Sequence, residues 1–343
     1  MLHFEVSWEV IPLKLKEVFT IARGSKSEVQ NVFLKITKDG ITGYGEAGPN
    51  TRYGETDEKV VNFFESLPND FFDALTDVSE IKPKLDSLKL LDIFSARAAV
   101  EMAWLDWWAK SRSRPLWKLW GYHSPVCPVS SYTIGIDSIE KMQQKVRAAD
   151  RYPVYKIKLG TENDHDIIKA IREITDKPLR VDANEGWVTL EKAKQEIKFL
   201  ESQNVELIEQ PMPASELELM KELKQWSVLP LAADESFTGT ENLKEIAAAF
   251  DVINIKLMKM GSLNEARLVI KEAKQLGLKV MIGCMIESSL ANAAGALLGL
   301  DADYVDLDGH LLISNDVCKG LIIDDYMRVV LSDGPGFGVE CEC

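Results

Sequence analysis

The sequence predicts an α/β protein: a (β/α)8 TIM-type barrel, preceded by an α+β domain and completed by a C-terminal tail. From residue 129 onward, eight short apolar runs alternate with amphipathic helical stretches, the pattern of a closed parallel barrel. Five of these runs end in a lysine or a carboxylate, and these polar residues are spaced by 22 to 27 residues, the length of one βα unit. Because the C-terminal ends of barrel strands meet at one mouth, we expect a ring of polar side chains there.

The N-terminal domain is predicted to cover residues 1–121. Polar and apolar residues alternate on both sides of a Lys-Asp-Gly turn at residues 38–40, which indicates an antiparallel hairpin. From about residue 56 the periodicity becomes helical, and the clearest helix covers residues 95–111. Its three tryptophans are interpreted as core packing rather than as a ligand platform. Strands followed by helices favour an α+β domain over barrel units.

The barrel is predicted to cover residues 122–319, beginning in a segment punctuated by proline and glycine. The eighth unit departs from the pattern, because the chain then runs into a segment of strand and turn character. Residues 320–343 are therefore predicted to return to the N-terminal domain. The eight strand runs are VSSYTIGI, VYKIKLG, LRVDAN, VELIEQ, LPLAADE, VINIKLM, KVMIGCM and DYVDLDG.

Composition describes an ordinary soluble globular protein. The chain has 343 residues, of which 46% are hydrophobic and 27% charged. Its net charge of −14 argues against nucleic acid or an anionic membrane as a partner. The most apolar stretch, residues 281–300, contains Glu287 and is interpreted as a barrel strand followed by a buried helix, not as a membrane span.

The cysteines and the N-terminus favour a cytoplasmic protein. Five cysteines are odd in number and follow no paired spacing, so a disulfide framework is not expected. Cys341 and Cys343 are interpreted as part of a frayed terminus. The first ten residues lack the basic and apolar regions of a signal peptide.

Three acidic residues at consecutive strand ends predict a metal site. Asp182, Glu209 and Asp234 would present hard oxygen ligands from neighbouring strands, which suit Mg²⁺ or Mn²⁺ better than zinc. The alternative is that each acid caps the helix that follows it. Three consecutive strands ending in this way favour the metal site.

Two lysine-bearing strands lie beside these acids in the predicted ring. Lys156 and Lys158 are two residues apart on one strand, so both point into the barrel. Adjacent ammonium groups depress each other's pKa, which would prepare a lysine to act as a base near neutral pH. Lys256 comes from the strand across the barrel. A base on each side of one carbon is the arrangement needed to remove a proton and return it from the opposite face.

With these five strands in order, the chain resembles the enolase superfamily, and within it the muconate-cycloisomerase-like subgroup. That subgroup has Lys-x-Lys on the second strand, Asp, Glu and Asp on strands three to five, and Lys on strand six. The N-terminal domain resembles the family's capping domain. The resemblance implies one Mg²⁺ per subunit, which holds a substrate carboxylate and stabilises an enediolate after α-proton abstraction. It also implies that Lys158 and Lys256 are the acid/base catalysts, that Lys156 assists electrostatically, and that the chain can form a homo-oligomer.

A second pair of acids narrows the substrate within this subgroup. Asp306 and Asp308 are two residues apart on the eighth strand and would face inward, forming a receptor for a cation such as a peptide ammonium. Dipeptide epimerases carry this Asp-x-Asp. The resemblance therefore implies epimerisation of the C-terminal residue of an Ala-Xaa dipeptide. The alternative for the pair is helix capping or solvation at the barrel rim.

Four further residues are predicted to line the substrate pocket. Arg23, in the loop ARGSKSE of the N-terminal domain, resembles the arginine with which Ala-Glu epimerases meet a side-chain carboxylate, although it could equally be a surface residue. Thr133 follows the first strand, and Cys284 and Met285 follow the seventh. Glu, Ala and larger apolar side chains all remain compatible with the epimerised residue.

Two other functions remain open. One is a lyase or cycloisomerase such as o-succinylbenzoate synthase, which would use the same core but would be indifferent to Asp306→Asn. The other is a barrel that binds a dipeptide or a metal without catalysis, although binding alone requires neither Lys158 nor Lys256.

Overall fold

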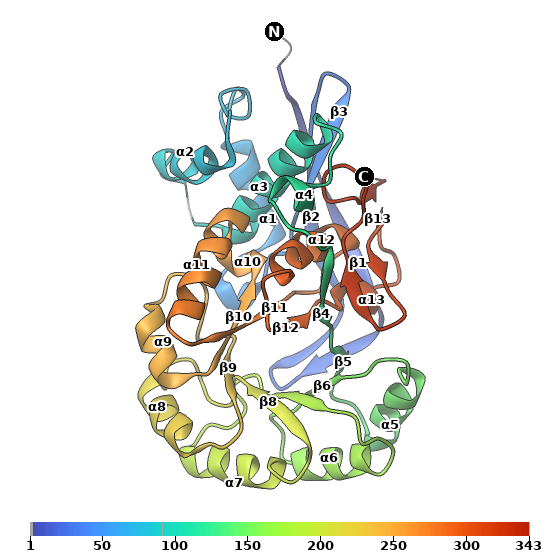
Figure 1. The fold of residues 1–343 in the computed structure, drawn as a ribbon, viewed down its shortest axis with the longest axis vertical. Helices are drawn as coiled ribbons and strands as arrows, with labels where there is room; N and C mark the ends of the chain where they lie inside the picture. The colour runs from blue at the N-terminus through green and yellow to red at the C-terminus, as the bar shows by residue number, and fades with distance from the viewer. Residues whose placement is uncertain (1–2, 91, 343) are drawn as a thin grey trace.

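The computed structural model describes residues 3–90 and 92–342, and it contains an eight-stranded parallel barrel next to an α+β domain (Figure 1). The barrel strands pair in chain order, and each lies within one of the eight predicted runs. A parallel bridge between Ser130 and Val305 brings the first and last strands together, so the barrel is nearly closed. The strands are β5 (Tyr132–Ile134), β6 (Tyr155–Lys158), β7 (Leu179–Asp182), β8 (Val205–Glu209), β9 (Leu231–Ala233), β10 (Val252–Lys256), β11 (Lys279–Gly283) and β12 (Tyr304–Asp306).

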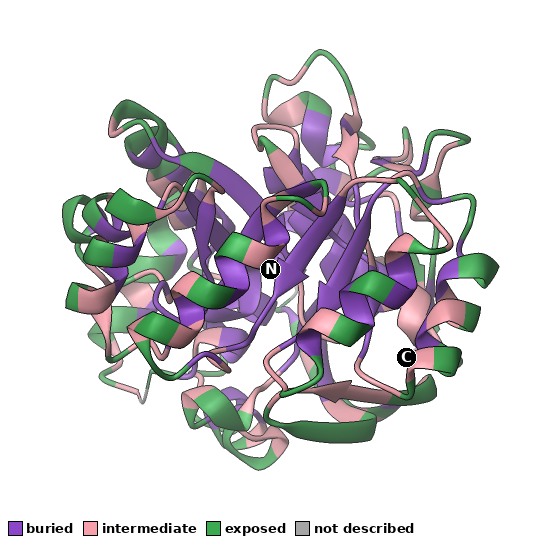
Figure 2. Ribbon diagram, turned by 90° about the horizontal axis from the view of Figure 1, so that it is seen from below, coloured by how far each residue is buried: buried purple, intermediate pink, exposed green. Residues whose placement is uncertain are grey.

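Amphipathic helices surround the barrel, with buried strands at the centre and exposed helix faces outward (Figure 2). Several begin at the serine or threonine that caps them: Thr189 accepts a hydrogen bond from the backbone of α7, and Ser262 does so for α11. The helices are α5 (Ile139–Ala148), α6 (Asp164–Arg172), α7 (Leu190–Leu200), α8 (Leu217–Trp226), α9 (Leu243–Ala249), α10 (Leu257–Met260), α11 (Leu263–Gln275), α12 (Ser289–Gly299) and α13 (Gly309–Leu312).

Helices α12 and α13 in particular depart from a regular barrel unit. Every residue of α12 is buried, because β3 (Ile41–Ala47) of the N-terminal domain and the tail cover its outer side. The interpretation of the apolar stretch 281–300 as a strand and a buried helix is therefore confirmed. Helix α13 has only four residues, which is why the eighth unit was weak in the sequence. Among residues 3–90 and 92–342, no helix combines the length and apolar character that crossing a bilayer requires.

The N-terminal domain is an antiparallel sheet covered by helices. Its hairpin turns at Asp39 and Gly40, whose φ angles of 55° and 75° match the predicted tight turn. Helix α3 packs directly on β3, and a Cβ atom at Gly45 would collide with the carbonyl oxygen of Ala99. The elements are β1 (Glu5–Ile21), β2 (Gly24–Lys38), β3 (Ile41–Ala47), α1 (Asp57–Glu65), α2 (Ile81–Ser87), α3 (Phe94–Lys110) and α4 (Leu116–Leu119).

The C-terminal tail returns to the N-terminal domain, as the sequence predicted. The carbonyl oxygen of Gly336 accepts a hydrogen bond from the backbone of Leu116, at 2.8 Å, and the backbone of Phe337 donates to Asp106 on α3, at 3.1 Å. The division at residues 121 and 319 stays a prediction. The remaining short strands are β4 (Val126–Val129), β13 (Cys318–Lys319), β14 (Ile322–Ile323), β15 (Arg328–Val330) and β16 (Glu340–Cys341).

A disulfide bond between Cys318 and Cys341 corrects the sequence interpretation of the cysteines. Strands β13 and β16 pair antiparallel and place the two residues opposite each other. The interpretation of Cys341 as part of a frayed terminus is therefore wrong, and Cys343 lies outside the described residues. The two partners are separated by 23 residues, and only the pairing of the two strands reveals them.

Reduction of this disulfide is expected to lower the free energy of unfolding by about 3 kcal/mol, since the bond closes a loop of moderate length in the unfolded chain. Thermal melting with and without dithiothreitol measures the effect. The matched control is the double variant Cys318→Ala/Cys341→Ala, whose melting temperature should not respond to dithiothreitol. An unchanged melting temperature of the wild-type protein would show that the bond does not constrain the chain in solution.

Two buried glutamates join the N-terminal domain to the barrel. Glu46 on β3 accepts hydrogen bonds from the backbone and hydroxyl of Ser288, at 2.9 and 2.5 Å, at the start of α12. Glu101 on α3 accepts a hydrogen bond from the backbone of Asn264, at 2.8 Å, at the start of α11. Each carboxylate thus satisfies donors at the N-terminus of a barrel helix. Burial raises the pKa of Glu101 to about 7.

The raised pKa of Glu101 predicts a dependence of stability on pH. Because the folded protein holds this proton more tightly than the unfolded chain, its contribution to stability is full below pH 4.5 and is lost as the pH rises through about 7. Gln cannot ionise, so the free energy of unfolding of Glu101→Gln should rise relative to that of wild type by up to about 3 kcal/mol as the pH increases from 4.5 to above 7. Urea unfolding at pH 5 and pH 8 measures the difference. Glu140→Gln, at an exposed position of α5, should show no such gain.

Candidate active site

A cavity of about 450 Å³ opens at the C-terminal ends of the barrel strands, beneath the loop that joins β1 and β2. Ten of the twelve residues that the sequence placed in the site line this cavity, and the other two, Asp182 and Glu209, are fully buried beside Asp234. The ten are Arg23, Thr133, Lys156, Lys158, Asp234, Lys256, Cys284, Met285, Asp306 and Asp308.

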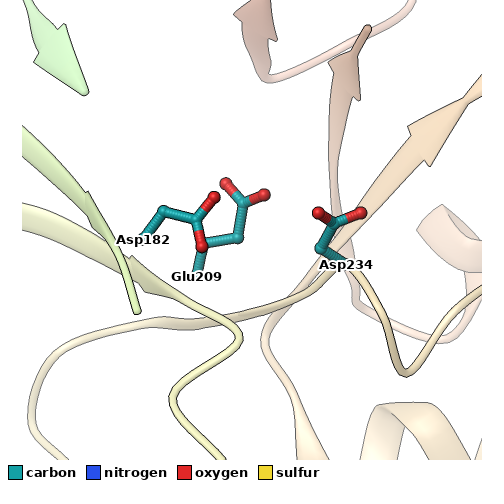
Figure 3. A group of neighbouring side chains, drawn as sticks. All are labelled: Asp182, Glu209 and Asp234. Carbon is teal, nitrogen blue, oxygen red and sulfur yellow. The ribbon is translucent and has the colours of Figure 1, made fainter. Parts of the chain in front are cut away.

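The three predicted metal ligands form one cluster. Asp182 ends β7, Glu209 ends β8, and Asp234 directly follows β9, and one carboxylate oxygen from each lies within 4.8 Å of the others (Figure 3). All three side chains are buried. Burial and the nearby Asp182 raise the pKa of Glu209 to about 8, so the cluster can carry three negative charges at neutral pH only with cationic charge beside it. A set of oxygen donors alone fits Mg²⁺.

The helix-capping alternative for these acids is wrong. The residues that cap the helices following β7, β8 and β9 are Thr189, Glu216 and Asn242, each several residues beyond the strand end. Instead, Asp182 accepts a hydrogen bond from the backbone of Asn184, at 2.9 Å, which leaves its second oxygen facing the cluster.

Three predicted lysines surround the acidic cluster. The Nζ atom of Lys158 lies 2.6 Å from Asp182, and that of Lys256 lies 2.7 Å from Asp234. Strands β6 and β10 are four positions apart in the eight-stranded barrel, so the two amines approach from opposite sides. This is the arrangement expected of two bases acting on opposite faces of one carbon.

The carboxylates, rather than the neighbouring amine, dominate the electrostatics of these lysines. Burial alone would lower the pKa of Lys156, but Asp306, Glu209 and Asp182 raise it well above its usual value. Likewise Asp234 and Glu209 outweigh burial and raise the pKa of Lys256. The sequence predicted that Lys156 and Lys158 lower each other's pKa. For Lys156 this prediction is wrong, because the acids around it carry more charge than Lys158 does.

A fourth lysine, Lys259, was missed by the sequence interpretation. Its Nζ atom donates to the Oδ1 atom and the backbone oxygen of Asp234, at 2.7 and 2.6 Å, and to the backbone of Phe237, at 2.8 Å. The side chain is buried on α10, one turn beyond Lys256. A lysine inside an apolar run was the available signal. Lys259 fixes the orientation of Asp234.

The two acids of the eighth strand have different partners. Asp306 accepts from the hydroxyl of Ser131, at 2.6 Å, and from Lys156, at 2.8 Å. Asp308 accepts from the backbone of Thr133, at 2.6 Å. Burial and the charge of Asp306 raise the pKa of Asp308 to about 6. Although Asp308 precedes α13, its side chain makes no capping hydrogen bond, so the capping alternative is wrong there too.

Arg23 connects the loop between β1 and β2 to the barrel mouth. Its guanidinium lies 2.6 Å from Glu235 and 3.1 Å from Glu185, and it donates to the backbone oxygen of Asn184, at 2.8 Å. Arg52 also contacts Glu185, at 2.9 Å. Arg23 is thus not a free surface residue. Sequence reasoning missed both glutamates, because neither ends a strand.

The site combines a parallel barrel, a cluster of buried carboxylates and two lysines on opposite sides of that cluster. These features define a class of metal-dependent enzymes that abstract a proton from the carbon next to a carboxylate. Residues 5–121 match the family described as mandelate racemase / muconate lactonizing enzyme, N-terminal domain, and residues 138–342 match the enolase C-terminal domain-like family. This chain belongs to the enolase superfamily, as its sequence resemblance implied.

Curated relatives cover nearly the whole chain. An L-Ala-D/L-Glu epimerase of Bacteroides thetaiotaomicron is 39% identical over 95% of this chain and 85% of its own length. An L-Ala-D/L-amino acid epimerase of Flavobacterium johnsoniae is 38% identical over 95% of this chain and 96% of its own.

Solved structures of dipeptide epimerases have the same fold as this chain. The substrate-liganded L-Ala-D/L-Glu epimerase from Bacillus subtilis is 28% identical and superposes with a TM-score of 0.90, covering 99% of both chains. A dipeptide epimerase from Enterococcus faecalis, complexed with Mg and L-Leu-L-Tyr, is 30% identical with a TM-score of 0.89, covering 98% of this chain and 99% of its own.

Proposed function

We propose that this protein is a Mg²⁺-dependent dipeptide epimerase that inverts the Cα atom of the C-terminal residue of Ala-Xaa dipeptides. The observation that carries the proposal is the placement of Lys158 and Lys256 on opposite sides of the barrel, each within 2.7 Å of one acid of the cluster. The curated relatives that act on L-Ala dipeptides support the substrate class.

The reaction requires one proton to leave and another to arrive from the other face. One lysine, as a neutral amine, takes the α-proton while the C–H bond breaks, and the other, as an ammonium, donates a proton to the opposite face. Lys156, between Asp182 and Glu209, adds positive charge beside the substrate carboxylate. Asp182, Glu209 and Asp234 would hold one Mg²⁺ per subunit, which when bound supplies the charge that stabilises the negative charge spreading onto the substrate carboxylate as the α-proton leaves.

The pocket residues would hold the two ends of the dipeptide. The substrate ammonium would lie at the pair Asp306 and Asp308, with Thr133, Cys284 and Met285 lining the cavity around the N-terminal residue. A substrate with a carboxylate at one end and an ammonium at the other matches this distribution of charge.

Isotope exchange tests the proposal. The protein is incubated with Mg²⁺ and a library of Ala-Xaa dipeptides in D₂O, and deuterium at each α-carbon is measured by mass spectrometry. Deuterium should enter the C-terminal residue and accompany inversion. Failure of every dipeptide would contradict the proposal, and exchange only in N-succinyl amino acids or turnover of succinylbenzoate precursors would assign the chain to another branch of the superfamily.

Arg23 gives a separate prediction about side-chain specificity. If the guanidinium of Arg23 contacts the side-chain carboxylate of the substrate, Arg23→Ala should lower kcat/KM for Ala-Glu about 10-fold. The kcat/KM for Ala-Ala should stay nearly unchanged, because Ala-Ala has no side-chain carboxylate and loses no charged contact. The matched control is Arg52→Ala, which removes the other arginine that contacts Glu185. Equal losses for both dipeptides would mean that Arg23 only anchors the loop.

We also propose that the protein works in the cytoplasm and assembles as a homo-oligomer. Cys127 and Cys284 are free thiols, as a reducing compartment favours, whereas the disulfide between Cys318 and Cys341 is of a kind that is rare in the cytoplasm outside hyperthermophiles. Cell fractionation tests the location, and light scattering on a size-exclusion column tests the assembly.

A further inference from the structure

Glu235, at the wall of the cavity, has one carboxylate oxygen without a hydrogen-bond donor. The residue directly follows Asp234 and lines the cavity, although it is only 6% exposed. Its Oε1 atom accepts a hydrogen bond from the side-chain amide of Asn184, at 3.2 Å, and lies 2.6 Å from the guanidinium of Arg23. Its Oε2 atom is buried and receives no hydrogen bond from residues 3–90 or 92–342. A buried acceptor in this state is stabilised when a ligand brings a donor.

Glu185, the second carboxylate beside Arg23, has a donor for each oxygen. Its Oε1 atom accepts hydrogen bonds from the backbone of Ala214 and from Arg52, each at 2.9 Å. Its Oε2 atom accepts from Arg52, at 2.9 Å, and from Arg23, at 3.1 Å. Glu185 is also not among the residues that line the cavity. Of the two glutamates, it is therefore Glu235 that can meet a molecule in the cavity with an unused oxygen.

The charge of Arg23 is already balanced inside the protein. A substrate carboxylate that approached this guanidinium would also meet the negative charges of Glu185 and Glu235. If it displaced Glu235, that buried carboxylate would lose its cationic partner, which is a costly change. An ammonium on the substrate could donate to Glu235, but it would face the positive charge of Arg23. A neutral amide avoids both conflicts, because its oxygen can accept from the guanidinium while its NH₂ group donates to Glu235.

The position of Glu235 indicates which part of the substrate it meets. In the proposed function, the C-terminal carboxylate of the dipeptide lies at the metal cluster, which includes Asp234, the neighbour of Glu235. The substrate ammonium lies at Asp306 and Asp308, and β12, which ends at Asp306, is three positions away from β9 in the barrel. The group closest to Glu235 is thus the side chain of the C-terminal residue.

We propose that Glu235 is a specificity-determining residue: together with Arg23, it selects a C-terminal residue with a neutral amide side chain, such as glutamine, over one with a carboxylate, such as glutamate. This inference rests on the proposed function for the orientation of the dipeptide. The contacts of Glu235 within the protein do not depend on it.

The experiment compares Ala-Gln with Ala-Glu, which differ only in an amide and a carboxylate. For the wild type, kcat/KM of α-proton exchange in D₂O should be about 10- to 100-fold higher for Ala-Gln. In Glu235→Gln this ratio should fall about 10-fold or more, because the amide loses a charged acceptor and Arg23 becomes available to the carboxylate. Ala-Ala has no polar side chain, so its kcat/KM should stay nearly unchanged.

Glu185→Gln is the matched control. It removes a negative charge from the same arginine, Arg23, but at a position that lies outside the cavity lining and has no unused oxygen. The ratio of kcat/KM for Ala-Gln to that for Ala-Glu should therefore stay close to the wild-type value in this variant. An equal fall of the ratio in both variants would show that only the net charge around Arg23 matters, which would overturn the role of the oxygen of Glu235.

Binding measurements separate this inference from the proposed function. Isothermal titration of the wild type with each dipeptide, in the presence of Mg²⁺, does not require turnover. If Ala-Gln binds more tightly than Ala-Glu but neither exchanges its α-proton, the proposed function fails and the role of Glu235 stands.

Three results would overturn the inference. The first is a wild type that binds Ala-Glu as tightly as Ala-Gln, or more tightly, and this result decides even if Glu235→Gln fails to fold. The second is the same preference in Glu235→Gln and wild type, which would mean that water satisfies the unused oxygen. The third is the absence of binding by either dipeptide.

Discussion

Replacement of Lys158 by alanine is expected to abolish α-proton exchange from one stereoisomer of the dipeptide while sparing exchange from the other, and replacement of Lys256 is expected to do the reverse. The reason is geometric: β6 and β10 stand on opposite sides of the barrel, so each amine reaches one face of the α-carbon. Epimerisation, which needs both, should fall by about 10²- to 10⁴-fold in either variant.

The measurement is deuterium incorporation in D₂O, run separately on the two pure stereoisomers. Lys194→Ala, which removes a remote ion pair with Glu222, is the matched control and should behave as wild type. If both isomers still exchange in Lys158→Ala, a single base serves both faces, and the assignment of the two lysines is wrong.

Removal of divalent cations is expected to abolish activity, and addition of Mg²⁺ to restore it. The acids Asp182, Glu209 and Asp234 are buried with oxygens within 4.8 Å of one another, and a divalent cation would relieve their mutual repulsion. Glu209→Gln replaces a ligand that can ionise by a neutral amide, so it should weaken cation binding by more than the 10- to 100-fold typical of losing a group that only supports a ligand.

Mn²⁺ titration of the variant, followed by electron paramagnetic resonance, measures this effect. The control is Glu235→Gln, since Glu235 is buried next to Asp234 in sequence but faces Arg23 instead of the cluster. Activity that survives exhaustive chelation, or Mn²⁺ affinity that is the same in Glu209→Gln and wild type, would contradict the metal site.

The barrel and the residues at its mouth could be predicted because both follow from patterns within short stretches of the sequence. Strand alternation fixes which residues face inward, and a parallel barrel places every strand end at one mouth, so Asp182 and Lys256 could be placed together without any contact being known. The family resemblance then supplied their roles. The eighth unit was weak for a physical reason, since α13 is a single turn and gives no helical periodicity.

What the sequence did not reveal depends on contacts between distant segments. The bond between Cys318 and Cys341 follows from strand pairing in the tail, and Glu101 reaches the start of α11 across the junction of the two parts of the chain. Lys259 carried a weak signal, because a buried lysine in an apolar run is visible but its acidic partner is not. Which acid pairs with a buried lysine, such as Asp234 with Lys259, can be seen only in the structure.

The caps that Glu46 and Glu101 provide have a consequence for how substrate reaches the cavity. Because both carboxyl groups accept hydrogen bonds from backbone donors at the starts of α12 and α11, a rotation of the whole N-terminal domain would leave both buried groups without these donors. Opening is therefore confined to the segments above the mouth, where Arg23 and Arg52 rest on Glu185. Product release would then break the ion pairs of Arg23 and Arg52, including the contact of Arg23 with the buried Glu235. New specificities can evolve by changing these segments while the residues beneath them stay the same.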